Sequence, residues 1–79
     1  MTRTLRCALV GTGAVAQLHA RAVAAHPHAE LVAVTDLSRA AADDFAGQWG
    51  GSDVYDSLDA LLAAEHPDVV LICTPPAVH

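Results

Sequence analysis

Short apolar runs alternate along this chain with longer segments whose apolar residues recur at helical spacing. The apolar runs lie at 6–10, 30–36, 54–55 and 69–73, and helical segments begin near residues 14, 38 and 57. Runs that are apolar at successive positions suit strands buried on both faces, and helices between such strands connect them by right-handed crossovers. The pattern predicts an α/β fold, a doubly wound parallel sheet with four strands in the order 3-2-1-4. Residues 77–79 resemble the first turn of a further helix, so we expect the fold to be incomplete at its C-terminal side.

The spacing of apolar residues also predicts which face of each helix is buried. In the first helix, Val15, Leu18, Ala22 and Ala25 share one face, and Pro27 ends the segment. We expect this helix and the second to cover one face of the sheet and the third helix to cover the other. For the two later helices, the expected N-caps are Ser38 and either Asp56 or Ser57, and the expected packing residues are Ala41, Phe45, Trp49, Leu58, Leu61 and Leu62.

Composition and charge exclude several classes of protein. Hydrophobic residues make up 53% of the 79 residues and charged residues only 16%, which favours a packed core over disorder. The chain has four Arg, no Lys and nine acidic residues, for a net charge of -5, so no positive surface for nucleic acid is expected. The longest apolar run, 69–73, is far too short for a membrane helix. We expect a soluble protein that binds neither nucleic acid nor membranes.

The two cysteines, Cys7 and Cys73, suit a reducing, cytoplasmic setting. If the first and fourth strands are neighbours, the two residues lie roughly 10 Å apart along the strands, which is too far for a disulfide. Neither cysteine has the spacing of a zinc site, and the histidines show no spacing that places metal ligands on a common face. We therefore expect both cysteines in the core and no metal site.

A glycine-rich turn lies between the first apolar run and the first helix. Its sequence, Gly11-Thr12-Gly13-Ala14-Val15-Ala16, follows the pattern G-x-G-x-x-A. The first Gly permits a tight turn, the second lets a pyrophosphate approach the backbone, and the small Ala16 lets the helix pack closely on the strand. The N–H groups and the dipole of the first helical turn favour phosphate there, so we expect residues 11–15 to bind a dinucleotide. The alternative is a turn that only connects a strand to a helix.

An acidic residue, Asp36, ends the second apolar run about 20 residues after the glycine turn. A carboxylate at this position accepts hydrogen bonds from the hydroxyl groups of an adenosine ribose; the alternative is a turn residue or a cap for the second helix. The carboxylate would repel a 2′-phosphate, so NAD is the preferred cofactor. NADP stays open, because Ser38 and Arg39 are close enough in sequence to accommodate a phosphate if Asp36 turns away.

A proline-containing segment, Thr74-Pro75-Pro76-Ala77-Val78-His79, follows the fourth apolar run. The crevice between the first and fourth strands is the point at which open α/β sheets bind ligands. Two prolines fix the backbone there, so the segment could form a rigid wall beside a flat cofactor ring. We count Thr74, Pro75, Pro76 and His79 among the expected cofactor-binding residues, although a Pro-Pro segment is also common as a simple turn.

Together these residues resemble the N-terminal, NAD(P)-binding Rossmann part of the Gfo/Idh/MocA family, which includes inositol dehydrogenases and glucose-fructose oxidoreductase. The resemblance covers nearly the whole chain. It rests on the glycine turn with His19 after it, on residues 30–34 followed by Asp36, on residues 67–70, and on Thr74-Pro75-Pro76-x-x-His79, which is the motif most specific to the family.

The resemblance implies an oxidoreductase that moves a hydride between a nicotinamide cofactor and a hydroxyl-bearing carbon of a sugar, cyclitol or related small molecule. In the family, the Pro and His residues of the last motif lie close to the nicotinamide, and a Lys in a Glu-Lys-Pro motif moves the hydroxyl proton. Because the chain has no Lys, we expect no catalytic residue within 1–79.

The expected domain organisation follows from the absence of the catalytic Lys. We interpret residues 1–79 as the N-terminal part of a dinucleotide-binding domain without its substrate domain, and we expect a homo-oligomer at full length. Two alternatives remain open. One is a non-catalytic module that senses NAD(H), and the other is an S-adenosylmethionine-dependent methyltransferase, whose glycine turn and strand acid can look similar.

Overall fold

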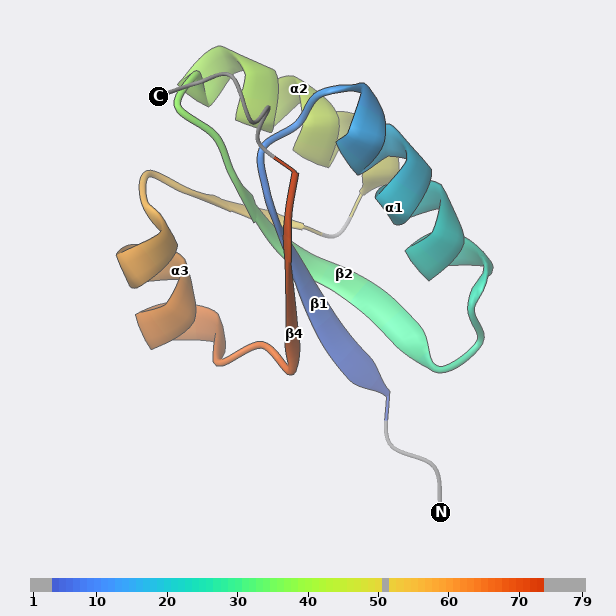
Figure 1. Ribbon diagram of the computed structural model, residues 1–79. Coiled ribbons are helices and arrows are strands. Elements are labelled where there is room, and N and C mark those ends of the chain that lie inside the picture. Colours follow the sequence, from blue (N-terminus) through green and yellow to red (C-terminus); the bar gives the residue numbers. More distant parts are fainter. Residues whose placement is uncertain (1–3, 51, 74–79) are drawn as a thin grey trace.

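The computed structural model describes residues 4–50 and 52–73. Strands and helices alternate along this part of the chain, as Figure 1 shows. The strands are β1 (Leu5–Val10), β2 (Ala29–Thr35), β3 (Asp53–Tyr55) and β4 (Val69–Ile72), and the helices are α1 (Ala14–Ala25), α2 (Arg39–Trp49) and α3 (Leu58–Glu65). The strands pair in parallel in the order β3-β2-β1-β4, so the predicted fold class and strand order are confirmed.

The helices form a layer on each face of the sheet (Figure 1). On the side of α1 and α2, Leu9 and Val34 from the central strands pack with Ala16, Ala42 and Phe45, all of them buried. Strand residues alternate between the faces, so the neighbouring positions supply the second core on the side of α3. Its buried members are Ala8, Ala33 and Leu61. The predicted placement of the helices is therefore confirmed.

The predicted buried face of α1 is wrong. Val15 and Leu18 are 53% and 63% exposed, whereas the buried residues of this helix are Ala16, Ala20 and Val23. The helix is apolar on most of its circumference, so the spacing of its apolar residues fits more than one face. The face made mainly of Ala is the one that lies against the sheet, because small side chains let the helix axis come close to the strands.

The helix ends follow the predicted capping residues. The side-chain oxygen of Ser38 accepts a hydrogen bond from the backbone N–H of Ala41 at 3.2 Å, and that of Ser57 accepts one from Ala60 at 3.1 Å. Ser57, and not Asp56, is therefore the cap of α3. Gly50 ends α2 at a φ of 68°, in the left-handed region that favours glycine.

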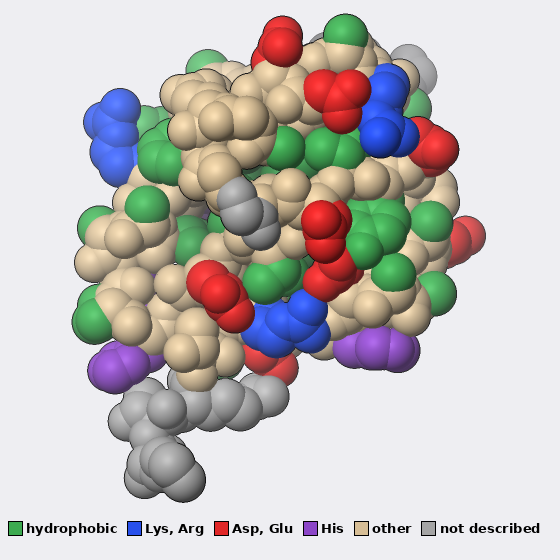
Figure 2. Space-filling model, turned by 180° about the vertical axis from the view of Figure 1, so that it is seen from behind, with side chains coloured by type: hydrophobic (Ala, Val, Ile, Leu, Met, Phe, Trp, Pro, Cys, Tyr) green, Lys and Arg blue, Asp and Glu red, His purple; other side chains and the backbone are tan. Residues whose placement is uncertain are grey.

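A polar cluster fastens the end of α3 to the sheet. Arg6 forms an ion pair with Glu65, with 2.6 Å between Nη2 and Oε1, and the Tyr55 hydroxyl donates to the other carboxylate oxygen of Glu65. The bond from Tyr55 is the main cause of the lowered pKa of Glu65, and the charge of Arg6 also contributes; the same bond raises the pKa of Tyr55 to about 12. On the face seen in Figure 2, some of the Arg side chains, in blue, lie directly against Asp and Glu side chains, in red.

Cys7 and Cys73 are both buried, as predicted, and both are free thiols. Cys7 pairs with Val69 across β1 and β4, so Cys73 is four residues further along the neighbouring strand. Burial raises the pKa of both thiols, which keeps them protonated and unreactive at neutral pH. Within the described residues, no His, Cys, Asp and Glu side chains gather into a metal-binding group, and no helix is long and apolar enough to cross a membrane.

Candidate functional site

A pocket of about 410 Å³ opens where the carboxyl ends of three parallel strands meet. Each strand continues into the pocket with the residues that follow it, because parallel strands all end at the same edge of the sheet. The lining residues come from the ends of β1, β2 and β3 and from the start of α3, and they are Val10, Gly11, Thr35, Asp36, Leu37, Asp56, Ser57 and Leu58.

The glycine turn between β1 and α1 has the backbone geometry that its sequence predicts. Gly11 has a φ of 96°, which L side chains rarely adopt, and its N–H donates to the Thr35 carbonyl at 2.8 Å. Gly13 is the N-cap of α1, where it offers no side chain to the first turn, and its carbonyl accepts a hydrogen bond from the Gln17 N–H at 3.2 Å. A Cβ added at Gly13 would meet nothing within 4 Å. The turn therefore leaves open space beside the amino end of a helix.

The carboxylate of Asp36 is hydrogen-bonded to this turn. Its Oδ2 accepts from the Thr12 N–H at 2.8 Å and from the Thr12 hydroxyl at 2.9 Å, and its Oδ1 accepts from the Ser38 N–H at 2.8 Å. Partial burial opposes ionisation of Asp36, but the bonds from Ser38 and Thr12 outweigh it and lower the pKa of the carboxyl group. The group is thus an anion at neutral pH, held between the glycine turn and the start of α2.

Arg39 is the first residue of α2 and is ion-paired to two carboxylates. Its Nη1 lies 2.7 Å from Asp56 Oδ1, and its Nε lies 3.1 Å from Asp43 Oδ1. The bond to Asp56, followed by the interactions with Asp43, raises the pKa of Arg39. Arg39 therefore lies near the pocket, as the sequence suggested, but its guanidinium is already engaged.

The predicted site residues other than Arg39 divide into three groups. Gly11 and Asp36 line the pocket, and Thr12 joins them through its bonds to Asp36. Gly13 and the first residues of α1, Ala14 and Val15, are exposed beside the turn. The remaining predicted residues, Thr74, Pro75, Pro76 and His79, lie outside the described residues.

Sequence reasoning missed the contributions of Leu37 and of the segment after β3. Leu37 is 95% exposed at the edge of the pocket, and Asp56, Ser57 and Leu58 form its far wall. The sequence did contain an indication that these residues line the site, because they come directly after expected strands, where ligands bind in parallel sheets. What the sequence does not show is that the turn after a strand of three residues, Asp53–Tyr55, reaches the same pocket as the glycine turn.

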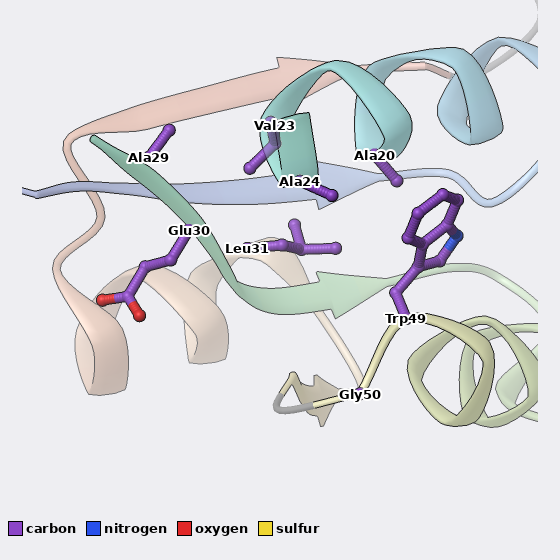
Figure 3. Close-up of a pocket in the computed structure, with 8 residues that line it drawn as sticks. All are labelled: Ala20, Val23, Ala24, Ala29, Glu30, Leu31, Trp49 and Gly50. Atoms are coloured by element: carbon purple, nitrogen blue, oxygen red, sulfur yellow. The ribbon is translucent and has the colours of Figure 1, made fainter. Parts of the chain in front are cut away.

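A second pocket, of about 280 Å³, lies between the C-terminal halves of α1 and α2 and the beginning of β2 (Figure 3). Small side chains of α1, Leu31 and the indole of Trp49 point into it, while the carboxylate of Glu30 points away from the indole. The Trp49 Nε1–H donates to Gln17 at 3.2 Å. This pocket is at the opposite end of β2 from Asp36, so it is separate from the site at the glycine turn.

The strand order, the glycine turn after β1 and the acid after β2 define the Rossmann class of nucleotide-binding folds. The profile of the oxidoreductase family with an NAD-binding Rossmann fold, Gfo/Idh/MocA, matches residues 5–79. The chain belongs to this family, and NAD is the cofactor of its Rossmann domain.

Three known proteins illustrate the similarity. The chain is 42% identical over 76 residues to an inositol 2-dehydrogenase of Rhizobium meliloti (strain 1021), which covers 96% of this chain and 22% of that protein. It is 40% identical over 76 residues to a D-glucoside 3-dehydrogenase of Escherichia coli (strain K12), covering 95% and 22%. The crystal structure of the WlbA dehydrogenase from Bordetella pertussis in complex with NADH and UDP-GlcNAcA superimposes with a TM-score of 0.88 at 32% identity, over 100% of this chain and 23% of that one. The chain thus spans less than a quarter of the length of these relatives.

Proposed function

We propose that this chain is the cofactor-binding part of an oxidoreductase that transfers a hydride between NAD and a hydroxyl-bearing carbon of a sugar, cyclitol or related small molecule. The observation that carries the proposal is the direct contact between the two halves of the candidate site. The Asp36 carboxylate lies 2.8 Å from the backbone nitrogen of Thr12, in the middle of the glycine turn. In a site that binds one dinucleotide, the carboxylate that bonds the ribose and the turn that binds the pyrophosphate have to lie this close together.

The glycine turn is suited to the pyrophosphate. The open space at Gly13 lets a phosphate reach the backbone, and the N–H groups of the first turn of α1 have no partner within the helix itself. These donors and the helix dipole stabilise negative charge without any cationic side chain. This fits a chain with no Lys and few Arg.

The adenosine half fits the pocket at the ends of β2 and β3. An ionised carboxylate has about four acceptor positions, and the Asp36 carboxylate uses three of them for Thr12 and Ser38. A ribose hydroxyl could take the place of the Thr12 hydroxyl, which is free to rotate away, while the two backbone bonds keep the carboxylate in position. The exposed side chain of Leu37 and the side chain of Leu58 offer apolar surface to the adenine.

Bound NAD supplies the hydride acceptor, and the protein has to supply the substrate site and a group that moves the hydroxyl proton. We propose that Thr74, Pro75, Pro76 and His79 face the nicotinamide half, because in the sequence they come after β4, which pairs in parallel with β1 and ends at the same edge of the sheet. No described side chain is proposed as the acid or base. We propose that a Lys outside residues 1–79 has this role and that residues 1–79 are the N-terminal part of the dinucleotide-binding domain.

The substrate class is supported by the relatives that are named as dehydrogenases of inositol and of glucosides. The test uses the full reading frame that contains this chain, with NAD⁺ and either myo-inositol or a glucoside, and follows NADH by its absorbance. We expect NADH to form with one of these polyols. Tight binding of NADH without turnover of any polyol would contradict the proposed dehydrogenase activity and favour a sensing module. Binding of S-adenosylmethionine in place of NADH would contradict NAD as the cofactor.

A further inference from the structure

Two carboxylates line the pocket, and one of them pairs with a guanidinium that also pairs with a third carboxylate outside the lining. Asp36 and Asp56 both line the pocket, and Arg39 lies between Asp56 and Asp43 with ion-pair distances of 2.7 Å and 3.1 Å. Arg39 comes three residues after Asp36, and Asp56 follows β3, the strand next to β2. One partner of Arg39, Asp43, thus comes from the same helix, and the other, Asp56, comes from the turn after β3.

The two cofactors NAD and NADP differ only by a phosphate on the adenosine 2′-oxygen, which carries close to two negative charges. A site accepts this phosphate when an Arg near the end of the second strand can bond its oxygens, ideally with two parallel N–H donors. In this chain the Nη1 donor of Arg39 bonds Asp56 and the Nε donor bonds Asp43. These bonds use two of the five N–H donors of the guanidinium, so a 2′-phosphate would compete with two carboxylates for Arg39.

We propose that Asp56 is a cofactor-specificity residue that holds Arg39 away from an adenosine 2′-phosphate and so makes the site select NAD over NADP. The proposal rests on the proposed function, since it assumes that the adenosine ribose lies at Asp36. Asp56 acts on the guanidinium in two ways. It accepts a hydrogen bond from Nη1 of Arg39, and it adds a second negative charge to the pocket beside Asp36.

The exposure of these side chains supports a role in selectivity over one in stability. The side chain of Arg39 is 57% exposed and that of Asp56 is 83% exposed. Exposed ion pairs contribute little to folding, so the pair is easily broken by substitution without loss of the fold. An exposed pair is nevertheless enough to bias the choice between two ligands that differ by one phosphate.

The test compares the Kd values of NADH and NADPH for the protein of the full reading frame and for its Asp56→Asn variant, measured by calorimetry at one low salt concentration. We expect the ratio of the NADPH affinity to the NADH affinity to rise about fivefold, which is the effect of releasing one exposed ion pair. Asp44→Asn is the matched control. It removes the same charge from an exposed position of α2, and Asp44 is not one of the two ion-pair partners of Arg39 in the described part of the chain, so the ratio should not change.

A double variant, Arg39→Gln with Asp56→Asn, separates release of Arg39 from simple loss of negative charge. We expect the gain in NADPH affinity to disappear in the double variant. If the gain persists without Arg39, or if Asp56→Asn leaves the ratio unchanged while NADH still binds, the role proposed for Asp56 is wrong and the proposed function stands. If neither nucleotide binds the unmodified protein of the full reading frame, the proposed function itself fails.

Discussion

Replacing Gly13 with Val is expected to lower the affinity for NADH about 100-fold while leaving the protein folded. The Cβ of the new residue would meet nothing within 4 Å, and the backbone at Gly13, with φ at -79°, is open to any L residue. The side chain would instead fill the space through which a pyrophosphate reaches the backbone. The free energy of unfolding should change by no more than about 1 kcal/mol, the size of an N-cap effect. Calorimetry with NADH and urea denaturation measure the two quantities separately.

Gly47→Ala is the matched control for this experiment. Gly47 is an exposed residue inside α2, and an added Cβ there also meets nothing within 4 Å. Because Ala is the better helix former, the control should raise the free energy of unfolding by about 0.5 to 1 kcal/mol and leave the NADH affinity unchanged. Equal NADH affinity for Gly13→Val and the unmodified chain would show that the phosphates do not lie at the glycine turn.

Replacing Leu61 with Ala should lower the free energy of unfolding by about 3 kcal/mol, more than any of the other substitutions. Leu61 is fully buried and packs with Ala8 and Ala33 on the face of the sheet that α3 covers. The two partners are small, so they cannot move to fill the cavity left by a shortened side chain. For a domain of this size, such a loss is a large share of the total free energy of unfolding. Urea denaturation with a fixed m-value is the appropriate measurement.

Leu62→Ala is the control on the same helix. The Leu62 side chain is 39% exposed, so the same deletion should cost less than about 1 kcal/mol. Equal losses for the two variants would contradict the assignment of Leu61 as the residue that fastens α3 to the sheet. The comparison also concerns the site, because α3 begins at the wall of the pocket with Leu58.

The fold was predictable because the strands are short and mainly apolar, and because a turn residue follows each of the first three. Gly11, Asp36 and Gly50 each lie within one residue of an observed element boundary. The buried face of α1 was not predictable from spacing, since Val15 and Leu18 fit a helical stripe as well as Ala16 and Ala20 do. The choice between the two faces depends on how closely the helix approaches the sheet, and this is a tertiary property.

The candidate site was predictable only in its separate parts. The sequence indicates that Asp36 follows a strand and that Thr12 lies in a glycine turn, but their hydrogen bond depends on the pairing of β1 with β2. The ion pair between Arg39 and Asp56 likewise depends on β3 lying next to β2. Both contacts join residues that are far apart in the sequence, so they come from strand order, and local patterns do not encode them.

The most direct test of the site is an NMR titration of the ¹⁵N-labelled chain with NADH, in which the backbone amide of each residue reports on its own surroundings. We predict the largest shift changes at Gly11, Thr12, Gly13 and Asp36, with little change at Leu31 and Trp49 in the second pocket. Shift changes centred on that second pocket, or a folded chain whose amides do not respond to NADH, would contradict the assignment of the dinucleotide to the glycine turn.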